Sequence, residues 1–367
     1  MMRISHAILH AFDFESGSYS FSQRELDVSE RAIKSYVQRH MRKISSSVEN
    51  KHGQFSEGSG FADALHGYVG GQIDFVEISQ QVAQYLWEEL RRCDDLEECD
   101  LLVCDFTDTK DMKVRAEEAG NGAVAEAMVE AANEGEDGFE DLSQEFFAAV
   151  LLPRRQAFVH ELGSDAVGAP SNGILRHDST LPNPTQKVDS YVVVDLSDFS
   201  IDFHDKVRTV GSQERMVIPD GLLQCSVQAS SKEVVEAVEK IVADVAEEYG
   251  ANVTEAVAQA KAVVRSSADR EESFTPEEVG RQVFEDRPQM KERFEEVSRQ
   301  QDLPEEVPVK RGVANRLAKN HKIKTDTGIE ITFPSQYAAD DNYIEFTTDA
   351  DGYVSIVIKN VGKIENK

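Results

Sequence analysis

Apolar residues recur along this chain with two different periods, which predict both helices and strands. A spacing of three and four residues predicts helices at 27–44, 61–69, 75–92, 231–249, 252–267, 276–285 and 289–301. Asp27 and Glu30 form a capping-box pattern at the start of the first of these helices. Alternating or short apolar runs predict strands at 4–13, 18–24, 101–106, 146–152, 156–162, 191–196 and 199–203, with a loop at 163–173.

The C-terminal stretch has the pattern of a small β unit. Ile329, Ile331 and Phe333 alternate with polar residues, and aromatic and β-branched runs follow at 343–346 and 353–358. Gly328 and Gly352 supply the turns, because glycine tolerates positive φ. We therefore expect a meander of three or four strands.

These elements predict an α+β (mixed α/β) protein with three regions. We expect an N-terminal α/β domain with a mixed sheet at 1–205, a helical region at 206–302, and a basic segment with a small antiparallel β-meander at 303–367. The chain of 367 residues is long enough to bury a large core. No run of eighteen apolar residues and no signal peptide is evident, so no membrane association is expected.

Charge is distributed very unevenly along the chain. The formal net charge is −29, and residues 94–145 hold 18 acidic and three basic residues. Against this background, 15 residues contain six bases and no acid: Lys310, Arg311, Arg316, Lys319, Lys322 and Lys324. The predicted helix at 27–44 carries a second basic face, formed by Arg31, Lys34, Arg39, Arg42 and Lys43. Such clusters can hold a polyanion or a carboxylate-rich partner, although a basic helix face can equally be a solvated surface.

Motifs that would carry catalysis are not found. Phosphate-binding loops, a serine elbow and the zinc-finger and RNP patterns are absent, and the four cysteines fit neither a zinc site nor a disulfide framework. Two His-Asp pairs, at 177–178 and 204–205, are weak signals because neighbouring strand residues point to opposite faces. Asp105 with Asp111 and Lys113 is a distant echo of a metal-dependent nuclease. We therefore predict no catalytic residue, no metal and no cofactor.

Several stretches resemble one known family, and they occur in its order. The resemblance is carried by ISHAILHAFDF at 4–14, Phe55-Ser56-Glu57, LPNPTQKVDSYVVVDL at 181–196, DFSIDFHDK at 198–206, IKTDTGIEI at 323–331, and IEF and DGYVSIVIKN at 344–346 and 351–360. The chain is thus similar to the bacterial 37-kilodalton nucleoid-associated protein family. Residues 107–145 depart from that family as an acidic insertion, which could be a solvated ornament, a lid, a partner site or a DNA mimic.

The resemblance implies a nonenzymatic, nucleoid-associated protein of the bacterial cytoplasm. Its basic residues would neutralise phosphates of duplex DNA with little base-specific readout, and six such contacts imply about a thousandfold loss of affinity between 50 and 200 mM salt. The alternative is a protein-interaction module that reaches the nucleoid through another chromosome-bound protein. A homodimer is plausible, because a twofold arrangement would double the basic faces.

Overall fold

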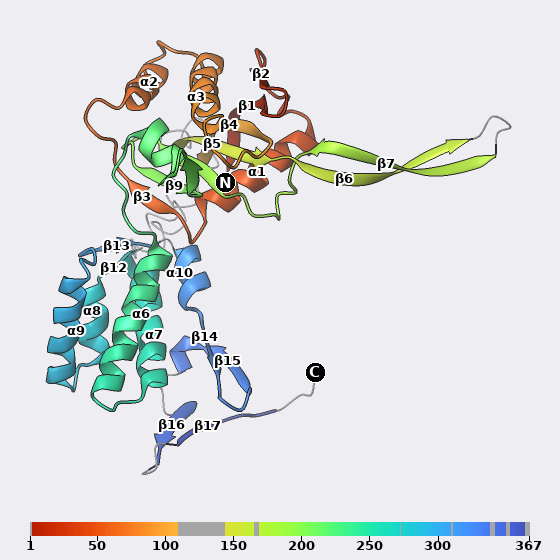
Figure 1. Ribbon diagram of the computed structural model, residues 1–367. Coiled ribbons are helices and arrows are strands. Elements are labelled where there is room, and N and C mark those ends of the chain that lie inside the picture. The colour runs from red at the N-terminus through yellow and green to blue at the C-terminus, as the bar shows by residue number, and fades with distance from the viewer. Residues whose placement is uncertain are drawn as a thin grey trace, which may run out of the picture. The chain divides into compact units, whose positions relative to one another are not determined.

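The computed structural model describes residues 2–108, 144–164, 169–271, 273–309, 311–337, 342–349 and 353–363 (Figure 1). The chain divides into two compact units, which are described separately. The first unit contains Met1–Ser45 and Lys51–Gln228, and the second contains Ser46–Asn50 and Ala229–Lys367. The predicted division at residues 205 and 302 stays a prediction. The predicted insertion at 107–145 lies, apart from its ends, outside the described residues.

A seven-stranded sheet forms the centre of the first unit, with the strand order β2-β1-β4-β5-β8-β9-β3. The strands are β1 (Arg3–Asp13), β2 (Ser18–Ser20), β3 (Lys51–Gly53), β4 (Cys99–Asp108), β5 (Gln144–Pro153), β8 (Ser190–Asp195) and β9 (Ile201–Asp205). The longest pairings are β1 with β4 and β4 with β5, and Leu102 of β4 is opposite both Leu9 and Val150.

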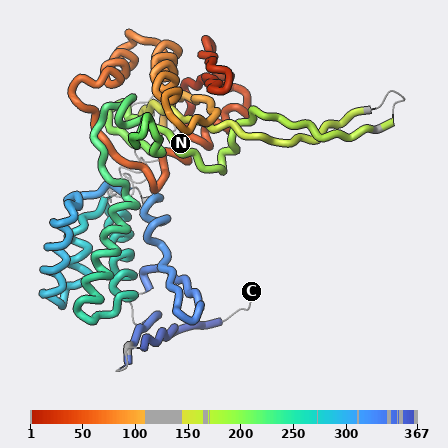
Figure 2. The backbone as a smooth tube through the Cα atoms, in the orientation of Figure 1, coloured from red at the N-terminus to blue at the C-terminus, as the bar shows by residue number. Residues whose placement is uncertain are grey.

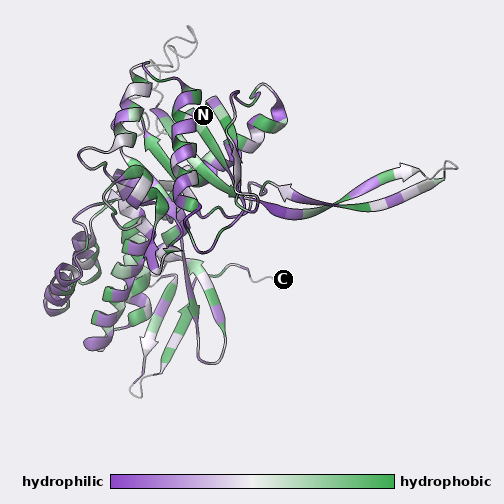
Figure 3. Cartoon of the chain, turned by 45° about the horizontal axis from the view of Figure 1, so that its top comes forward, coloured by the Kyte–Doolittle hydropathy of each residue, from purple (hydrophilic) through white to green (hydrophobic). Residues whose placement is uncertain are grey.

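Helices cover both faces of this sheet. α1 (Arg31–Ser45) buries Val37, Met41 and Ile44 against one face. α2 (Gly60–Val69) and α3 (Phe75–Leu90) pack on the other face. Alternate residues of each central strand therefore enter two separate cores, and Figure 3 shows hydrophobic colour along these strands. This explains why the central strands are apolar on both sides.

The predicted α+β class is confirmed, but the sheet differs from the expected mixed one. Every pairing among the described strands is antiparallel. Strands that are buried on both faces usually belong to parallel sheets, so their apolar sequence favoured the wrong pairing direction. Here α1, α2 and α3 all lie between β2 and β4 in the chain, and none of them connects the neighbouring strands β5, β8 and β9.

A long hairpin extends from the first unit as a two-stranded ribbon (Figures 1 and 2). It consists of β6 (Arg155–Ser164) and β7 (Pro170–Thr180), which pair with each other and with no other described strand. β6 was predicted, whereas the predicted loop at 163–173 is wrong at Gly163 and Ser164, which end β6, and from Pro170 onward. Residues 165–168 lie outside the described residues. β7 was missed because its apolar residues, Ile174 and Leu175, are adjacent and do not alternate with polar ones.

Helices form the body of the second unit. They are α6 (Ser231–Glu248), α7 (Val253–Glu271), α8 (Pro276–Val283), α9 (Pro288–Gln300) and α10 (Arg311–Ala318), together with a short pairing of β12 (Ser273–Phe274) and β13 (Val307–Pro308). A capping box opens α6, where Ser230 and Glu233 satisfy each other's backbone N–H groups. α10 was not predicted, because its basic residues disguise the apolar stripe of Val313, Ala314 and Ala318.

The C-terminal part consists of two hairpins, each of which is a separate two-stranded sheet. They are β14 (Asn320–Lys324) with β15 (Glu330–Pro334), and β16 (Ile344–Thr348) with β17 (Val354–Ile358). Phe333 and Ile344 pack together with Ala258 of α7, so side chains join the hairpins where a continuous meander was expected. Gly328 has a φ of +86°, which allows the tight turn between β14 and β15.

Candidate nucleic-acid interface

The basic segment at 310–324 becomes a helix followed by a strand in the second unit. Arg316 lies on α10, Lys319 follows that helix, and Lys322 and Lys324 lie on β14. We call these four residues the cationic strip, and all four are exposed. Of the other two predicted residues, Lys310 lies outside the described residues, and Arg311 begins α10 with a side chain that is not described.

Buried anchors hold the backbone of the cationic strip in place. Val313, Ala314 and Ala318 pack into the helical core, which fixes α10. The Ser335 hydroxyl donates to the Ala318 carbonyl, and the Ser335 N–H donates to the Lys319 carbonyl over 2.9 Å. Lys319 is therefore attached to a rigid backbone position, and its side chain remains exposed.

Strand alternation determines which way β14 presents its charges. His321 is 5% exposed and packs against Phe333 at a ring distance of 5.5 Å, so it faces the core. Burial, with a further contribution from Lys261, lowers the pKa of His321 to about 4. The ring is therefore neutral at pH 7 and adds no charge. Lys322 and Lys324 lie on the opposite face, with 61% and 67% of their side chains exposed.

One carboxylate is shared by the two lysines of β14. Glu330 lies directly opposite Lys324 on β15, and its oxygens are 2.8 Å from Lys322 Nζ and 4.0 Å from Lys324 Nζ. Exposed pairs of this kind contribute about 0–1 kcal/mol, so a phosphate can replace Glu330 at little cost. Arg316 and Lys319 make no ion pair with any residue that the structure describes. Among the described residues, the four positive charges of the cationic strip thus have one carboxylate, that of Glu330, within ion-pair distance.

The second predicted basic surface lies on α1, in the first unit. Arg31, Arg39 and Arg42 are exposed, as is Lys34. Lys43 is half-buried, and its ammonium donates to the carbonyls of Thr185 (2.9 Å) and Gln186. Burial lowers the pKa of Lys43, although Asp189 opposes this change. Lys43 therefore holds the 182–186 loop against α1, together with the Tyr36 hydroxyl, which donates to the Pro182 carbonyl over 3.0 Å.

In each of the two His-Asp pairs of the sequence, the aspartate interacts with an arginine and not with the neighbouring histidine. Asp178 forms an ion pair with Arg176 at 2.9 Å, and both side chains are more than half exposed. Asp205 is buried, and His204, the next residue along β9, lies on the opposite face of that strand. Neither pair forms a His-Asp contact among the described residues.

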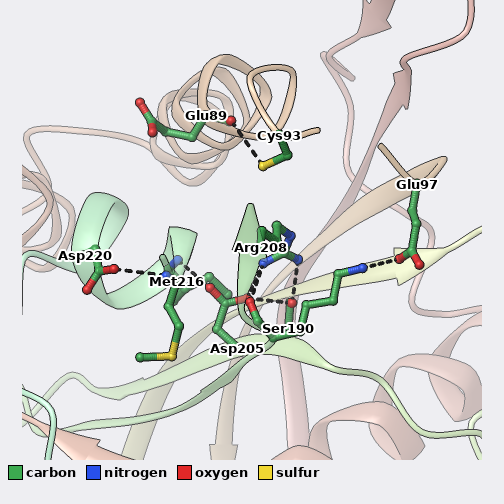
Figure 4. Close-up of polar contacts among 10 residues, drawn as sticks. Glu89, Cys93, Glu97, Ser190, Asp205, Arg208, Met216 and Asp220 are labelled. Atoms are coloured by element: carbon green, nitrogen blue, oxygen red, sulfur yellow. Dashed lines mark hydrogen bonds and ion pairs between the residues drawn. The ribbon is translucent and has the colours of Figure 1, made fainter. Parts of the chain in front are cut away.

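Asp205 belongs to a buried polar cluster that sequence patterns did not reveal (Figure 4). Its Oδ1 accepts from Arg208 Nη1 and from Ser190 Oγ, each at 2.6 Å, and its Oδ2 accepts from the Ile218 N–H at 2.8 Å. Arg208 Nη2 also donates to Ser190 Oγ at 2.7 Å. These residues lie at the ends of β8, β9, β10 (Arg208–Val210) and a π-helix (Ile218–Leu223), so the cluster joins four elements.

The nuclease echo is not assembled in the described structure. Asp105 accepts a hydrogen bond of 2.5 Å from the Tyr68 hydroxyl, and burial raises the pKa of its carboxyl group. Asp111 and Lys113 lie outside the described residues. Across the described part of the chain, no group of three or more His, Cys, Asp or Glu side chains is arranged to hold a metal ion. The four cysteines are free.

Comparisons with known proteins agree with the resemblance found in the sequence. No helix in the described ranges has the length and apolar character needed to cross a membrane. Among curated proteins, none matches the chain. The family model for nucleoid-associated protein YejK matches residues 8–366. Because this match covers nearly the whole chain, the protein belongs to the nucleoid-associated protein YejK family.

Proposed function

We propose that this protein binds duplex DNA directly and without catalysis, by phosphate contacts from the cationic strip. The observation that carries the proposal is the exposure of Arg316, Lys319, Lys322 and Lys324 on a helix and strand anchored to a core. Phosphate contacts position a protein on DNA but carry no sequence information. We therefore propose little base-specific readout, and a place of action in the bacterial nucleoid within the cytoplasm.

The α1 residues Arg31, Arg39 and Arg42 are the proposed second contact surface. They are exposed on a helix that packs against the sheet of the first unit. Lys43 takes a supporting position in this proposal, since its ammonium already binds two carbonyl groups. Substitution of the three arginines should therefore weaken DNA binding, whereas substitution of Lys43 should mainly loosen the 182–186 loop.

The salt dependence of binding tests the proposal. The four phosphate contacts of the cationic strip contribute about −3.6 to the slope of log K against log salt, which by itself lowers affinity about 150-fold between 50 and 200 mM salt. Contacts from Lys310 and Arg311 would raise that contribution to about −5.4, and contacts from the three α1 arginines would add about −2.7. The assay is fluorescence anisotropy with a labelled duplex and pure protein, repeated with a duplex of unrelated sequence to measure specificity.

The decisive variant replaces all four cationic-strip residues by Ala, which should flatten the slope by about 3.6. The matched control replaces four exposed cations elsewhere in the second unit, which changes the net charge equally: Lys240, Arg281, Arg287 and Arg299. An unchanged slope in the strip variant, or an equal change in the control, would reject this contact surface. If the pure protein does not bind DNA at all, the alternative of indirect association through another nucleoid protein gains support.

A further inference from the structure

The hairpin β6–β7, which we call the β-arm, exposes large apolar side chains with no cover from the described chain. Phe158 is 69% exposed, Leu162 is 77% exposed and Ile174 is 80% exposed. Val159 and Leu175 are 43% and 44% exposed. A two-stranded hairpin is marginally stable by itself in water, so this one needs a partner surface.

The strand register places the three most exposed residues on one face of the β-arm. His160 lies opposite Ile174, and Phe158 and Leu162 are two residues away from His160 on either side. Residues that are two apart on a strand, and residues directly opposite across a pair, share a face. Phe158, Ile174 and Leu162 therefore form a diagonal apolar row on a face that also carries His160, Arg176 and Asn172, and Val159 and Leu175 are paired on the reverse face.

The charges of the β-arm make nucleic acid a poor occupant for this face. The described residues of the two strands include two basic and two acidic side chains: Arg155, Arg176, Glu161 and Asp178. Arg176 is already held by Asp178 at 2.9 Å. A surface without net positive charge gains nothing from the release of counterions, which supplies most nonspecific DNA affinity.

The same neutrality suits contact with a second copy of this chain. Two copies with a formal net charge of −29 repel each other, so they can meet only at a surface free of acidic excess. β6 has ten residues, so the β-arm is about 33 Å long. This length is several times the Debye length of ~8 Å at physiological salt, so a contact along the β-arms can hold the first units of the two copies far enough apart for salt to screen their charges from each other.

The exposed area also fits a pair of β-arms. The three apolar side chains on the contact face present on the order of 400 Å², which is within the range of the largest patch of a monomer. Two such faces in contact bury about 800 Å² of apolar surface, and the polar side chains of the same faces bring the total to about the 1,000 Å² that a specific interface needs. In a twofold contact each copy contributes the same patch of its own β-arm, which is the usual form of a homodimer interface.

We propose that the β-arm is a dimerisation element, in which the Phe158–Ile174–Leu162 row of one copy packs against the same row of a second copy. A twofold axis near Ile174 places Phe158 of one copy beside Leu162 of the other. The arrangement covers both apolar rows. It is independent of DNA binding.

Sedimentation equilibrium of the full chain tests this proposal. The wild type should sediment at twice its monomer mass of 40.9 kDa at micromolar concentration. The variant with Phe158→Ser, Leu162→Ser and Ile174→Ser should dimerise at least about a hundredfold more weakly, because apolar anchors at the centre of an interface dominate its affinity. Ile174→Glu alone should do the same, since the two carboxylates would meet across the axis. The matched control is Val69→Ser, Leu96→Ser and Val207→Ser, three exposed apolar residues elsewhere in the first unit.

The salt dependence of the dimer separates this proposal from that of DNA binding. Raising salt from 50 to 500 mM should leave the dimer equally tight or tighten it, because screening removes repulsion between the acidic bodies. A wild type that stays monomeric at about 50 µM would overturn the proposal, and so would β-arm variants that dimerise as well as the control. If the β-arm variants lose DNA affinity but sediment at the same mass as the wild type, the β-arm would be a nucleic-acid contact, and the proposed dimer contact would be rejected.

Discussion

Removing Arg208 should destabilise the first unit strongly, because it would leave a buried carboxylate without its cation. The side chain of Asp205 is 0% exposed and that of Arg208 is 5% exposed. In an Arg208→Met variant, Asp205 keeps the Ile218 N–H and the Ser190 hydroxyl as donors but loses the guanidinium. Breaking a buried ion pair from one side typically costs 3–5 kcal/mol. The two remaining donors place our expectation at about 3 kcal/mol.

A double-mutant cycle tests whether the cost comes from an uncompensated charge. Asp205→Asn removes the carboxylate with little change of volume, and by itself it leaves Arg208 buried without an anion. The double variant Asp205→Asn with Arg208→Met contains neither charge, so it should lose less stability than the two single losses combined, by about 2–3 kcal/mol. The control is Arg92→Met, just after the end of α3. It breaks an ion pair with Glu89 of 2.8 Å whose arginine is 57% exposed, and it should cost less than about 1 kcal/mol.

The assay can report on the first unit alone, because the chain has a single tryptophan and Trp87 is buried in the core of that unit. Urea unfolding followed by Trp87 fluorescence gives the free energy of unfolding of each variant. A loss of about 3 kcal/mol corresponds to a fall of about 6–12 °C in Tm for a unit of this size. The reasoning is refuted if Arg208→Met costs no more than Arg92→Met, or if the losses of the two single variants simply add.

Two further predictions concern acid stability and helix packing. Burial is the main cause that lowers the pKa of three histidines from 6.5 to about 4: His10, His40 and His321. Between pH 6.5 and 4 the unfolded chain takes up protons that the folded chain does not, so the free energy of unfolding should decrease as the pH is lowered, by up to about 3 kcal/mol per histidine. Urea unfolding at pH 7 and pH 5 should show this decrease, and His40→Phe should make it smaller. Gly280→Ala would place a Cβ into the ring of buried Phe294 and should lower the free energy of unfolding by about 1–3 kcal/mol. Gly60→Ala, whose Cβ would meet open space, should be neutral or stabilising. Thermal unfolding followed by far-UV circular dichroism measures both variants.

Amphipathic patterns predicted the elements that pack on a core, and they failed where the pattern is interrupted or disguised. α3 was found because its apolar residues cover one face that is now buried against the sheet. β6 of the β-arm was predicted although the arm extends away from the core, whereas β7 was missed because its large apolar residues, Ile174 and Leu175, are adjacent and show no two-residue period. α10 was missed because the first six of its eight residues, RGVANR, include only one large apolar side chain, Val313.

The candidate site shows the same division between local and long-range information. The exposed positions of Arg316 and Lys319 follow from charge in the sequence. Sharing of Glu330 between Lys322 and Lys324 depends on the β14–β15 register, which periodicity alone does not determine. The Lys43 ammonium donates to the carbonyls of Thr185 and Gln186, and Thr185 is 142 residues away in the chain. Sequence reasoning could thus identify cations but could not tell which of them were already engaged.

The acidic excess of the chain limits how a direct DNA contact can work. The second unit contains 19 basic and 29 acidic residues, so the cationic strip is a local exception within a negative body. At 10 mM salt the Debye length is about 30 Å, and DNA bound at the strip would feel the repulsion of much of that unit. At 100 mM it is about 10 Å, and the nearest charges dominate. Attraction at the strip and repulsion from the body therefore weaken over different salt ranges. A plot of log K against log salt should be linear above about 50 mM and should bend toward weaker binding below it, because counterion release alone predicts no such bend.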